Sequence, residues 1–317
     1  MMYRFTLAIL IFTLVAGCST ASAMPPASTF TSVPTSGESS VVLASPTQAG
    51  ATEVQTSAAT KTARPPLAPD EWKTLPVVPA GISDSMREVY RRGLEMGNDP
   101  KHFSVIGDCQ NVSSYFLYVY DHPSEFSLGE QYASLQPTID YYQGSYSRKS
   151  LAVRGGFNVA AVQSPLRADP KSCNKNESPL DCELRTWKPS VVFVSMETWW
   201  SEKPAEVYGT HMRHVIERIL ATGAVPIIAT KADNLEGDNS INATIAQIAY
   251  DYDIPLWNFW AAVQPLPNHG LSSDNFHLTF ARNFFDDPER MKNAWPWRNL
   301  TALQALDAVH RGLVEQP

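Results

Sequence analysis

The sequence lacks an excess of positive charge, a membrane-spanning apolar run and more than a few cysteines. Its net charge is −7, with 25 lysines and arginines against 32 aspartates and glutamates. This balance excludes the basic face that non-specific nucleic-acid binding requires, so no nucleic-acid partner is expected. The chain has 317 residues, of which 44% are apolar, and it is therefore long enough for a full hydrophobic core. The four cysteines are few enough to be considered one by one.

The N-terminus carries an apolar run that is too short to cross a bilayer. FTLAILIFTLVA, residues 5–16, follows a single positive charge and precedes small residues, which is typical of an export signal. LVAGC, Leu14 to Cys18, resembles the lipobox of bacterial lipoproteins, which implies a signal peptide over 1–17 and a lipid on Cys18. The alternative is an ordinary signal peptide cleaved near Ala21–Ala23. Both predict an extracytoplasmic protein; the first makes it a membrane-anchored bacterial lipoprotein that meets the membrane through the lipid only.

The segment after this signal consists largely of Ser, Thr, Ala and Pro and has almost no aromatic side chains. Such a segment buries too little apolar surface to offset the entropy lost on ordering. Residues 18–69 are therefore expected to form a disordered tether. One globular domain over 70–317 follows.

Export places the remaining cysteines in an oxidising compartment, where free thiols tend to pair. Cys173 and Cys182 lie at the two ends of CNKNESPLDC, a polar loop that a disulfide could close. Zinc ligation is the weaker alternative, because structural zinc sites bring cysteines closer in sequence and need four ligands. With Cys18 lipidated and the loop closed, Cys109 is left without a disulfide partner.

Short apolar runs alternate with helical patterns from Asp70 onward. We expect strands at 102–107, 150–156, 190–196, 224–230 and 254–259, and helices at 111–120, 204–223, 240–253 and 301–313. The helix at 204–223 has Pro204 in its first turn, Gly223 at its end, and an apolar face made of Val207, Met212, Val215, Ile216 and Ile219. Strands separated by helices need crossover connections. The predicted fold is therefore α/β, a three-layer α/β/α sandwich with a central parallel sheet of about five strands.

Ligands of such sheets bind at the carboxyl ends of the strands, where the connecting loops meet. Small and polar residues follow the predicted strands at this edge, and several of them are candidates for the site. They are Asp108, Cys109, Gly155, Gly156, Asn158, Glu197, Thr198, Trp199, Trp200, Asp274 and His277.

Two of these stretches together resemble a known family over about residues 100–313. IGDC ends the first strand and DNFHLT lies near the C-terminus, and both resemble motifs of the SGNH (GDSL-type) hydrolases, in which the first motif ends in serine. The resemblance implies a flavodoxin-like fold with Cys109 as nucleophile, His277 as base and Asp274 as its orienting carboxylate. A thiolate can take this role where an imidazole and a helix N-terminus lower the pKa of the thiol.

The same resemblance implies an oxyanion hole, and here the sequence departs from the family. The family uses the backbone N–H groups of the nucleophile and a glycine, which implies Cys109 with Gly155 or Gly156. Its third donor is an asparagine, but VSMETWW has none. Only Thr198 or Glu197 could stand near that position, and Asn158 would have to compensate for the missing asparagine. Losing one such donor typically costs roughly 10²- to 10³-fold in rate.

Each candidate also has a structural interpretation. Cys109 could be an inert buried thiol in a decayed site, and His277 could form local turn hydrogen bonds only. Asp108 is expected to accept backbone N–H bonds rather than to do chemistry. The candidate binding residues are Asp108, Glu197, Trp199 and Trp200, although tryptophans more often serve packing. No metal site and no cofactor are expected.

Two functions of different class follow from these observations. The first is a lipid-anchored esterase or acyltransferase with a Cys109–His277–Asp274 triad, acting on small-molecule or polysaccharide O-acyl esters. The second is a non-catalytic binding protein that keeps the hydrolase fold. The retained D-x-x-H favours the enzyme, whereas the missing asparagine favours the binding protein.

Overall fold

A parallel sheet of four strands forms the centre of the computed structural model, which describes residues 65–196, 199 and 204–314. The strands pair in the order β1 (Asp99–Gly107), β3 (Pro189–Ser195), β4 (Val225–Ala229) and β5 (Leu256–Trp257). Every residue of β3 and β4 is buried. A parallel strand covered on both faces reads as a continuous apolar run, which is why these two were recognisable in the sequence.

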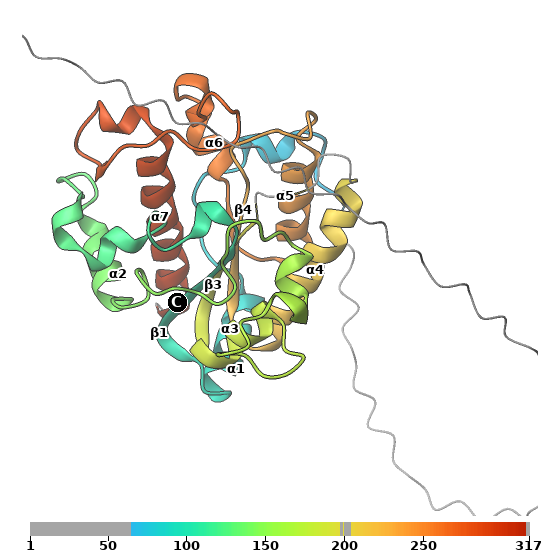
Figure 1. Ribbon diagram of the computed structural model, residues 1–317. Helices are drawn as coiled ribbons and strands as arrows, with labels where there is room; N and C mark the ends of the chain where they lie inside the picture. Colours follow the sequence, from blue (N-terminus) through green and yellow to red (C-terminus); the bar gives the residue numbers. More distant parts are fainter. Residues whose placement is uncertain (1–64, 197–198, 200–203, 315–317) are drawn as a thin grey trace, which may run out of the picture. The chain divides into compact units, whose positions relative to one another are not determined.

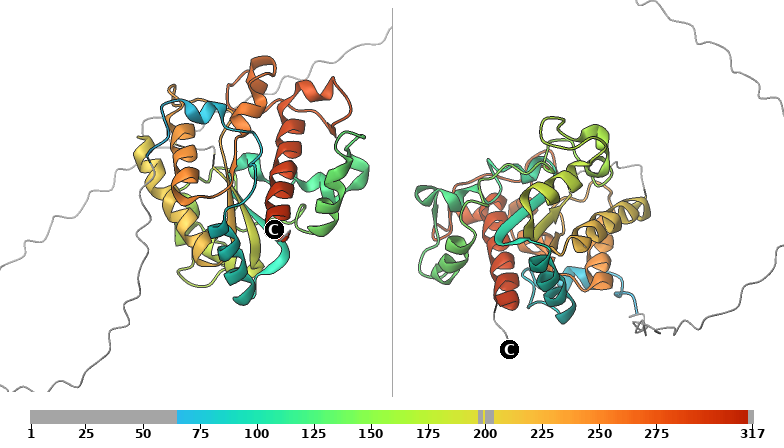
Figure 2. Two further views of the ribbon diagram at one scale, coloured as in Figure 1. Left: turned by 180° about the vertical axis from the view of Figure 1, so that it is seen from behind. Right: turned by 90° about the horizontal axis from the view of Figure 1, so that it is seen from below.

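Helices cover the sheet on both sides. Figure 1 shows α7 (Ala294–Val314) on one side of the strands and α4 (Ala205–Ala221) and α5 (Ser240–Tyr252) on the other, and the reverse view in Figure 2 shows the same three layers. The α/β/α fold with a parallel sheet is thus confirmed. The remaining helices are α1 (Asp84–Glu95), α2 (Gln136–Tyr141), α3 (Pro179–Trp187) and α6 (Phe259–Val263). A small separate sheet pairs β2 (Phe126–Ser127) with β6 (Asn283–Phe284).

Two predicted elements after β1 are wrong. The strand expected at 150–156 is reduced to one bridge between Gly107 and Val153. The helix expected at 111–120 is replaced by turns and two short 3-10 helices, Cys109–Asn111 and Tyr118–Asp121. Leu117 explains the second difference: its φ is +63°, and its N–H donates to the side chain of Asn299 on α7 rather than to the helical carbonyl. A distant side chain has replaced the local hydrogen bond.

Two predicted helices differ in detail. On α4 the exposed Val207 does not belong to the apolar face, whose place is taken by the buried Tyr208, and Pro204 precedes the helix rather than lying in its first turn. α7 begins at Ala294, upstream of the predicted start at 301, and includes Pro296. Proline is tolerated there because a first-turn N–H has no intrahelical acceptor. None of the helices among the described residues is long and apolar enough to span a membrane.

Candidate functional site at the carboxyl ends of the strands

Cys109 lies in the turn that follows β1. The preceding Asp108 is fully buried, and its Oδ1 accepts hydrogen bonds from the backbone N–H of Gln110 at 3.0 Å and the side-chain amide of Asn111 at 3.3 Å. Cys109 itself is not disulfide-bonded and has intermediate exposure. The buried carboxylate of Asp108 thus stabilises the turn by accepting these hydrogen bonds, in agreement with a structural role. Cys109, which follows it, is partly exposed.

Asn111 fixes this turn to the sheet. Its Nδ2 donates to the backbone carbonyl of Ser195 at the end of β3, at 2.8 Å. A Cβ atom on Gly107 would lie 2.3 Å from Cγ of Asn111, so only glycine fits at that position. The glycine before Asp108 is therefore required by the close approach of Asn111.

A buried arginine lies beneath this network. Arg298 on α7 is fully buried, and its Nη2 donates to Oδ1 of Asn111 at 3.0 Å and to Oγ of Ser195 at 2.9 Å. The rings of four aromatic residues surround its guanidinium at 4.9–5.9 Å: Phe116, Trp257, Phe259 and Trp295. Such cation–π contacts partly compensate for the lost hydration of the charge. Sequence reasoning missed Asn111, Ser195 and Arg298; an arginine beside two tryptophans in AWPWRNL was the one available signal.

The predicted glycines lie beside the thiol. Gly155 is close to Cys109, since a Cβ on Gly155 would lie 3.8 Å from Cβ of Cys109. Residues 154–157 form a turn closed by the N–H of Phe157 on the carbonyl of Arg154, and Gly156 has φ +81° at the third position, as a type II turn requires. Neither Gly155 nor Gly156 uses its backbone N–H within the described part of the chain.

Asn158 caps the next turn with one half of its amide. Its Oδ1 accepts from the backbone N–H groups of Ala160 at 3.0 Å and Ala161 at 2.9 Å. Its Nδ2 donates to no residue among those described. The amide oxygen of Asn158 therefore stabilises this turn, and the amide nitrogen is the atom that could donate a hydrogen bond to an oxyanion.

Asp274 and His277 form a second turn at the same edge. Nδ1 of His277 lies 2.6 Å from Oδ2 of Asp274, and Oδ1 of Asp274 accepts the backbone N–H groups of Phe276 and His277. These bonds, led by the one with the His277 side chain, lower the pKa of Asp274 to about 2. Because Nδ1 faces the carboxylate, Nε2 is the imidazole nitrogen open to a substrate or nucleophile. The imidazole side chain is 60% exposed.

A hydrogen bond connects the Cys109 turn to the Asp274–His277 turn. Nε2 of Gln110 donates to the backbone carbonyl of Phe276 at 3.2 Å. Gln110 directly follows Cys109, and Phe276 directly precedes His277. Residues that are 166 positions apart are thus brought together.

Of the four predicted site residues that follow β3, the structure describes only Trp199. Trp199 is partly buried and packs its ring against Tyr208 on α4, with ring centroids 5.6 Å apart. Glu197, Thr198 and Trp200 lie outside the described residues, as do Cys18, the predicted signal peptide over 1–17 and residues 18–64 of the predicted tether.

A buried charge cluster follows β4 at this edge. Nζ of Lys231 lies 2.6 Å from Oδ1 of Asp233 and 2.6 Å from Oε2 of Glu236. Burial raises the pKa of Asp233, and the neighbouring Lys231 opposes that rise. Two carboxylates share one ammonium group, and the cluster fixes the loop after β4.

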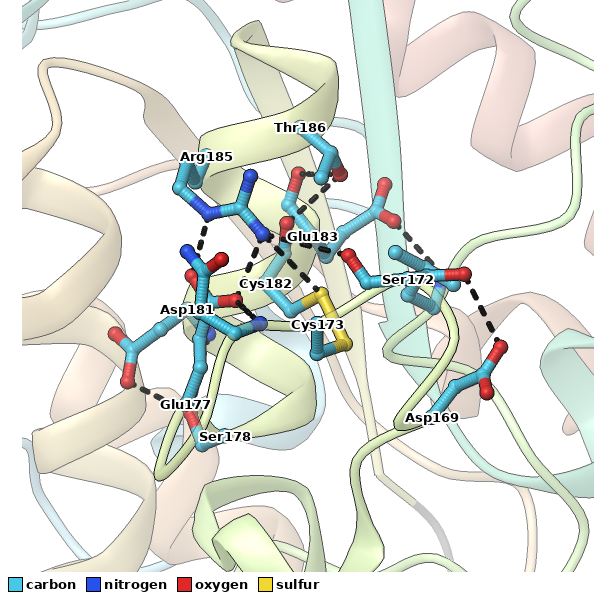
Figure 3. Close-up of a disulfide and its surroundings, with 12 residues drawn as sticks. Asp169, Ser172, Cys173, Glu177, Ser178, Asp181, Cys182, Glu183, Arg185 and Thr186 are labelled. Atoms are coloured by element: carbon cyan, nitrogen blue, oxygen red, sulfur yellow. Dashed lines mark hydrogen bonds and ion pairs between the residues drawn. A yellow bond between two sulfur atoms is a disulfide. The ribbon is translucent and has the colours of Figure 1, made fainter.

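The predicted disulfide between Cys173 and Cys182 is confirmed. Figure 3 shows the bond at the start of α3, with Glu177 beside it and bound to Arg185. The two sulfurs and a carboxylate oxygen of Glu177 lie within 4.8 Å of one another. Because metals bind thiolates, the disulfide leaves neither sulfur available as a ligand.

Comparisons with known proteins show distant structural similarity only. No family model matches the chain, and no curated protein does. A GDSL-like lipase from Bacteroides thetaiotaomicron VPI-5482 is 15% identical, with a TM-score of 0.40 over 70% of this chain and 98% of its own. A protein of the G-D-S-L family from Desulfitobacterium hafniense DCB-2 is 14% identical, with a TM-score of 0.39 over 65% of this chain and 99% of its own. TesA is 16% identical, with a TM-score of 0.37 over 63% and 99%. Similarities of this extent assign no activity.

Proposed function

We propose that the protein is a lipid-anchored, extracytoplasmic hydrolase or acyltransferase that acts on O-acyl esters, including those of polysaccharides, through Cys109, His277 and Asp274. The observation that carries the proposal is the hydrogen bond between Gln110 and Phe276, which brings the cysteine turn and the histidine turn together. The pairing of His277 with Asp274 supports it. This pairing leaves Nε2 free of the carboxylate, as a general base requires.

The proposed reaction proceeds in two steps, acylation and deacylation of Cys109. Nε2 of His277 removes the thiol proton, and the thiolate adds to the ester carbonyl; collapse of the tetrahedral intermediate expels the alcohol, which takes that proton from His277. A thioester on Cys109 remains. Water, deprotonated by His277, then attacks the thioester; the C–S bond breaks, the acid is released, and the thiolate of Cys109 regains the proton from His277. An alcohol in place of water gives acyl transfer. The backbone N–H groups of Cys109 and of Gly155 or Gly156, with Nδ2 of Asn158, are the proposed donors to the oxyanion.

Turnover of p-nitrophenyl acetate by the full-length chain in detergent tests this proposal. Cys109→Ala should lower kcat/KM by roughly 10³-fold or more, since the nucleophile is removed. Ser114→Ala serves as the matched control, because this exposed serine lies close by in the same loop and should leave the rate unchanged. Equal rates for wild type and Cys109→Ala would exclude the triad.

The same measurement addresses the second candidate, a non-catalytic binding protein. What favours it is that Oδ1 of Asn158 is occupied by backbone N–H groups, so only half of this amide can replace the asparagine missing after β3. If wild type, Cys109→Ala and Cys109→Ser all fail to hydrolyse the ester, the binding protein is the better description. Turnover by Cys109→Ser alone would indicate a serine site that the thiol has slowed.

The proposed anchor has its own test. Cys18→Ala should move the protein from the membrane fraction to the soluble fraction when the full-length gene is expressed in a bacterium. Cys109→Ala is the control and should stay with the membranes, because it removes a thiol without touching the lipobox. Equal membrane association of both variants would contradict lipidation at Cys18.

A further inference from the structure

A cavity of about 380 Å³ is lined by residues that follow the two proposed catalytic turns in the chain, and none of the proposed triad residues lines it. Its wall comes from the loop that continues from Cys109 and the loop that continues from His277: Tyr115 is six residues after the cysteine, and Phe280 is three after the histidine. The volume is at the lower end of the range of about 300–1,000 Å³ that is typical of ligand pockets.

One wall of this cavity is aromatic and open to solvent. Phe280 is 63% exposed and Tyr115 is 48% exposed, and their rings stand nearly perpendicular, at 88°, with centroids 6.4 Å apart. The ring of Trp295 lies 5.6 Å from that of Tyr115. Large rings are rarely left in water without a partner, and together these three form a corner that can accept a flat apolar surface.

The floor carries a hydrogen-bond donor with no acceptor in the described part of the chain. Oδ1 of the buried Asn299 accepts the N–H of Leu117, so its Nδ2 must donate, and it does so to Oδ1 of Asn283 at 2.9 Å. This bond orients the amide of Asn283, whose Nδ2 donates to no described residue although Asn283 is only 6% exposed. Asn283 lines the cavity, so a ligand oxygen bound there can accept a hydrogen bond from this amide.

Charged groups line the cavity as well. Arg282 is exposed, and the hydroxyl of Tyr118 donates to Oε2 of Glu125 at 2.5 Å. A quaternary ammonium group, which aromatic rings also bind, would meet the guanidinium of Arg282. A simple acyl chain would leave the amide of Asn283 without an acceptor.

We propose that this cavity binds a pyranose ring of a glycan. A pyranose has an apolar face of C–H groups, which fits the corner of Tyr115 and Phe280. Its rim of hydroxyls can form hydrogen bonds with the amide of Asn283 and with the charged groups of Arg282 and Glu125. The inference rests on the proposed function for its catalytic consequence, which is that the bound glycan carries the O-acyl group that Cys109 attacks. Binding of the sugar itself needs no active thiol.

The test uses the full-length chain carrying Cys109→Ala, so that nothing is turned over. Methyl glycosides of glucose, galactose, mannose, xylose and N-acetylglucosamine are titrated at millimolar concentrations, and tryptophan fluorescence is followed because Trp295 lines the cavity. At least one glycoside should give saturable binding. Adding Phe280→Ala should weaken it by roughly threefold to tenfold, as expected for one aromatic contact.

Two further variants define the site. Asn283→Asp keeps an acceptor for Asn299 but removes the open donor, and it should weaken binding by a similar factor. Met96→Ala is the matched control: this side chain is 53% exposed at the end of α1, before β1, and its loss should leave binding unchanged. Thermal unfolding of each variant confirms that the fold persists.

The outcomes separate this proposal from the proposed function. No saturable binding of any glycoside, or equal affinity after Phe280→Ala and Asn283→Asp, overturns the sugar site whether or not the wild type hydrolyses esters. Equal weakening by Met96→Ala also overturns it, since binding would then lie elsewhere. Saturable binding that depends on Phe280 and Asn283 supports it even if p-nitrophenyl acetate is not hydrolysed.

Discussion

The two turns that carry the proposed triad are built in opposite ways. The Cys109 turn lies on buried polar groups: Asp108 beneath it, then Asn111, and then Arg298 from the last helix. The Asp274–His277 turn is exposed and holds its shape by hydrogen bonds among its own residues.

Because of this difference, changes in the first turn should alter the free energy of unfolding, and changes in the second turn should alter the rate of the reaction. A change beneath the cysteine turn removes partners from buried groups, and the whole fold loses free energy. A change in the histidine turn touches few other residues, so it should affect the reaction and little else.

The largest effect is expected from His277→Ala. Loss of a general base should lower kcat/KM for p-nitrophenyl acetate by roughly 10²- to 10⁴-fold. The free energy of unfolding in urea should stay within about 0.5 kcal/mol of wild type, because the side chain is exposed. His269→Ala, an exposed histidine in a nearby turn, is the control and should leave both quantities unchanged. A marked loss of stability in His277→Ala would remove the contrast.

Unlike His277→Ala, Arg298→Leu should lower the stability of the fold. It leaves Oδ1 of Asn111 and Oγ of Ser195 without the guanidinium, in the protein interior. The free energy of unfolding should fall by about 2–4 kcal/mol. Arg311→Leu, an exposed arginine on the same helix, should cost less than about 1 kcal/mol. Equal losses in the two variants would mean that the buried network adds little.

Gly107→Ala tests the close approach above that network. The added methyl would lie 2.3 Å from Cγ of Asn111, so the turn must shift, at a cost of about 1–3 kcal/mol. Gly81→Ala is the control, since a Cβ there meets nothing within 4 Å. In a double variant with Asn111→Gly, which removes Cβ as well as Cγ, the cost of the added methyl should be relieved; strict additivity would refute the proposed clash.

The same contrast explains how much could be predicted from sequence. The buried strands β3 and β4 and the helices α4 and α5 follow from local apolar patterns and were predicted. The stretch 111–120 was not, because its apolar residues serve distant contacts: Leu117 bonds to Asn299, 182 positions away. The local sequence pattern gives no information about a hydrogen-bond partner this far away in the chain.

The site divides in the same way. Cys109, Asp274 and His277 stand in short motifs, so their residue types and spacing were informative. Arg298 is 187 positions from Asn111, and only the packing of α7 against the sheet brings them together. The roles proposed for Asn283 and Asn299 likewise depend on a hydrogen bond between their side chains, which the sequence does not reveal. Groups that support a site from beneath are therefore the part least accessible to sequence reasoning.

The smallest expected effect concerns acid. Hydrogen bonds with His277 and two backbone N–H groups lower the pKa of Asp274 from 3.8 to about 2. A carboxyl group whose pKa is depressed in the folded state stabilises the fold fully above its unfolded pKa and loses that contribution as the pH falls through its folded pKa. The thermal unfolding midpoints of wild type and Asp274→Asn should therefore differ by a constant amount above pH 3.8 and converge between about 3.8 and about 2. Because the carboxylate is exposed, the convergence should be small and weaker at high salt. Parallel curves over this range would show that the histidine turn is not held by its charged carboxylate, and the difference between the two turns would then lie in burial alone.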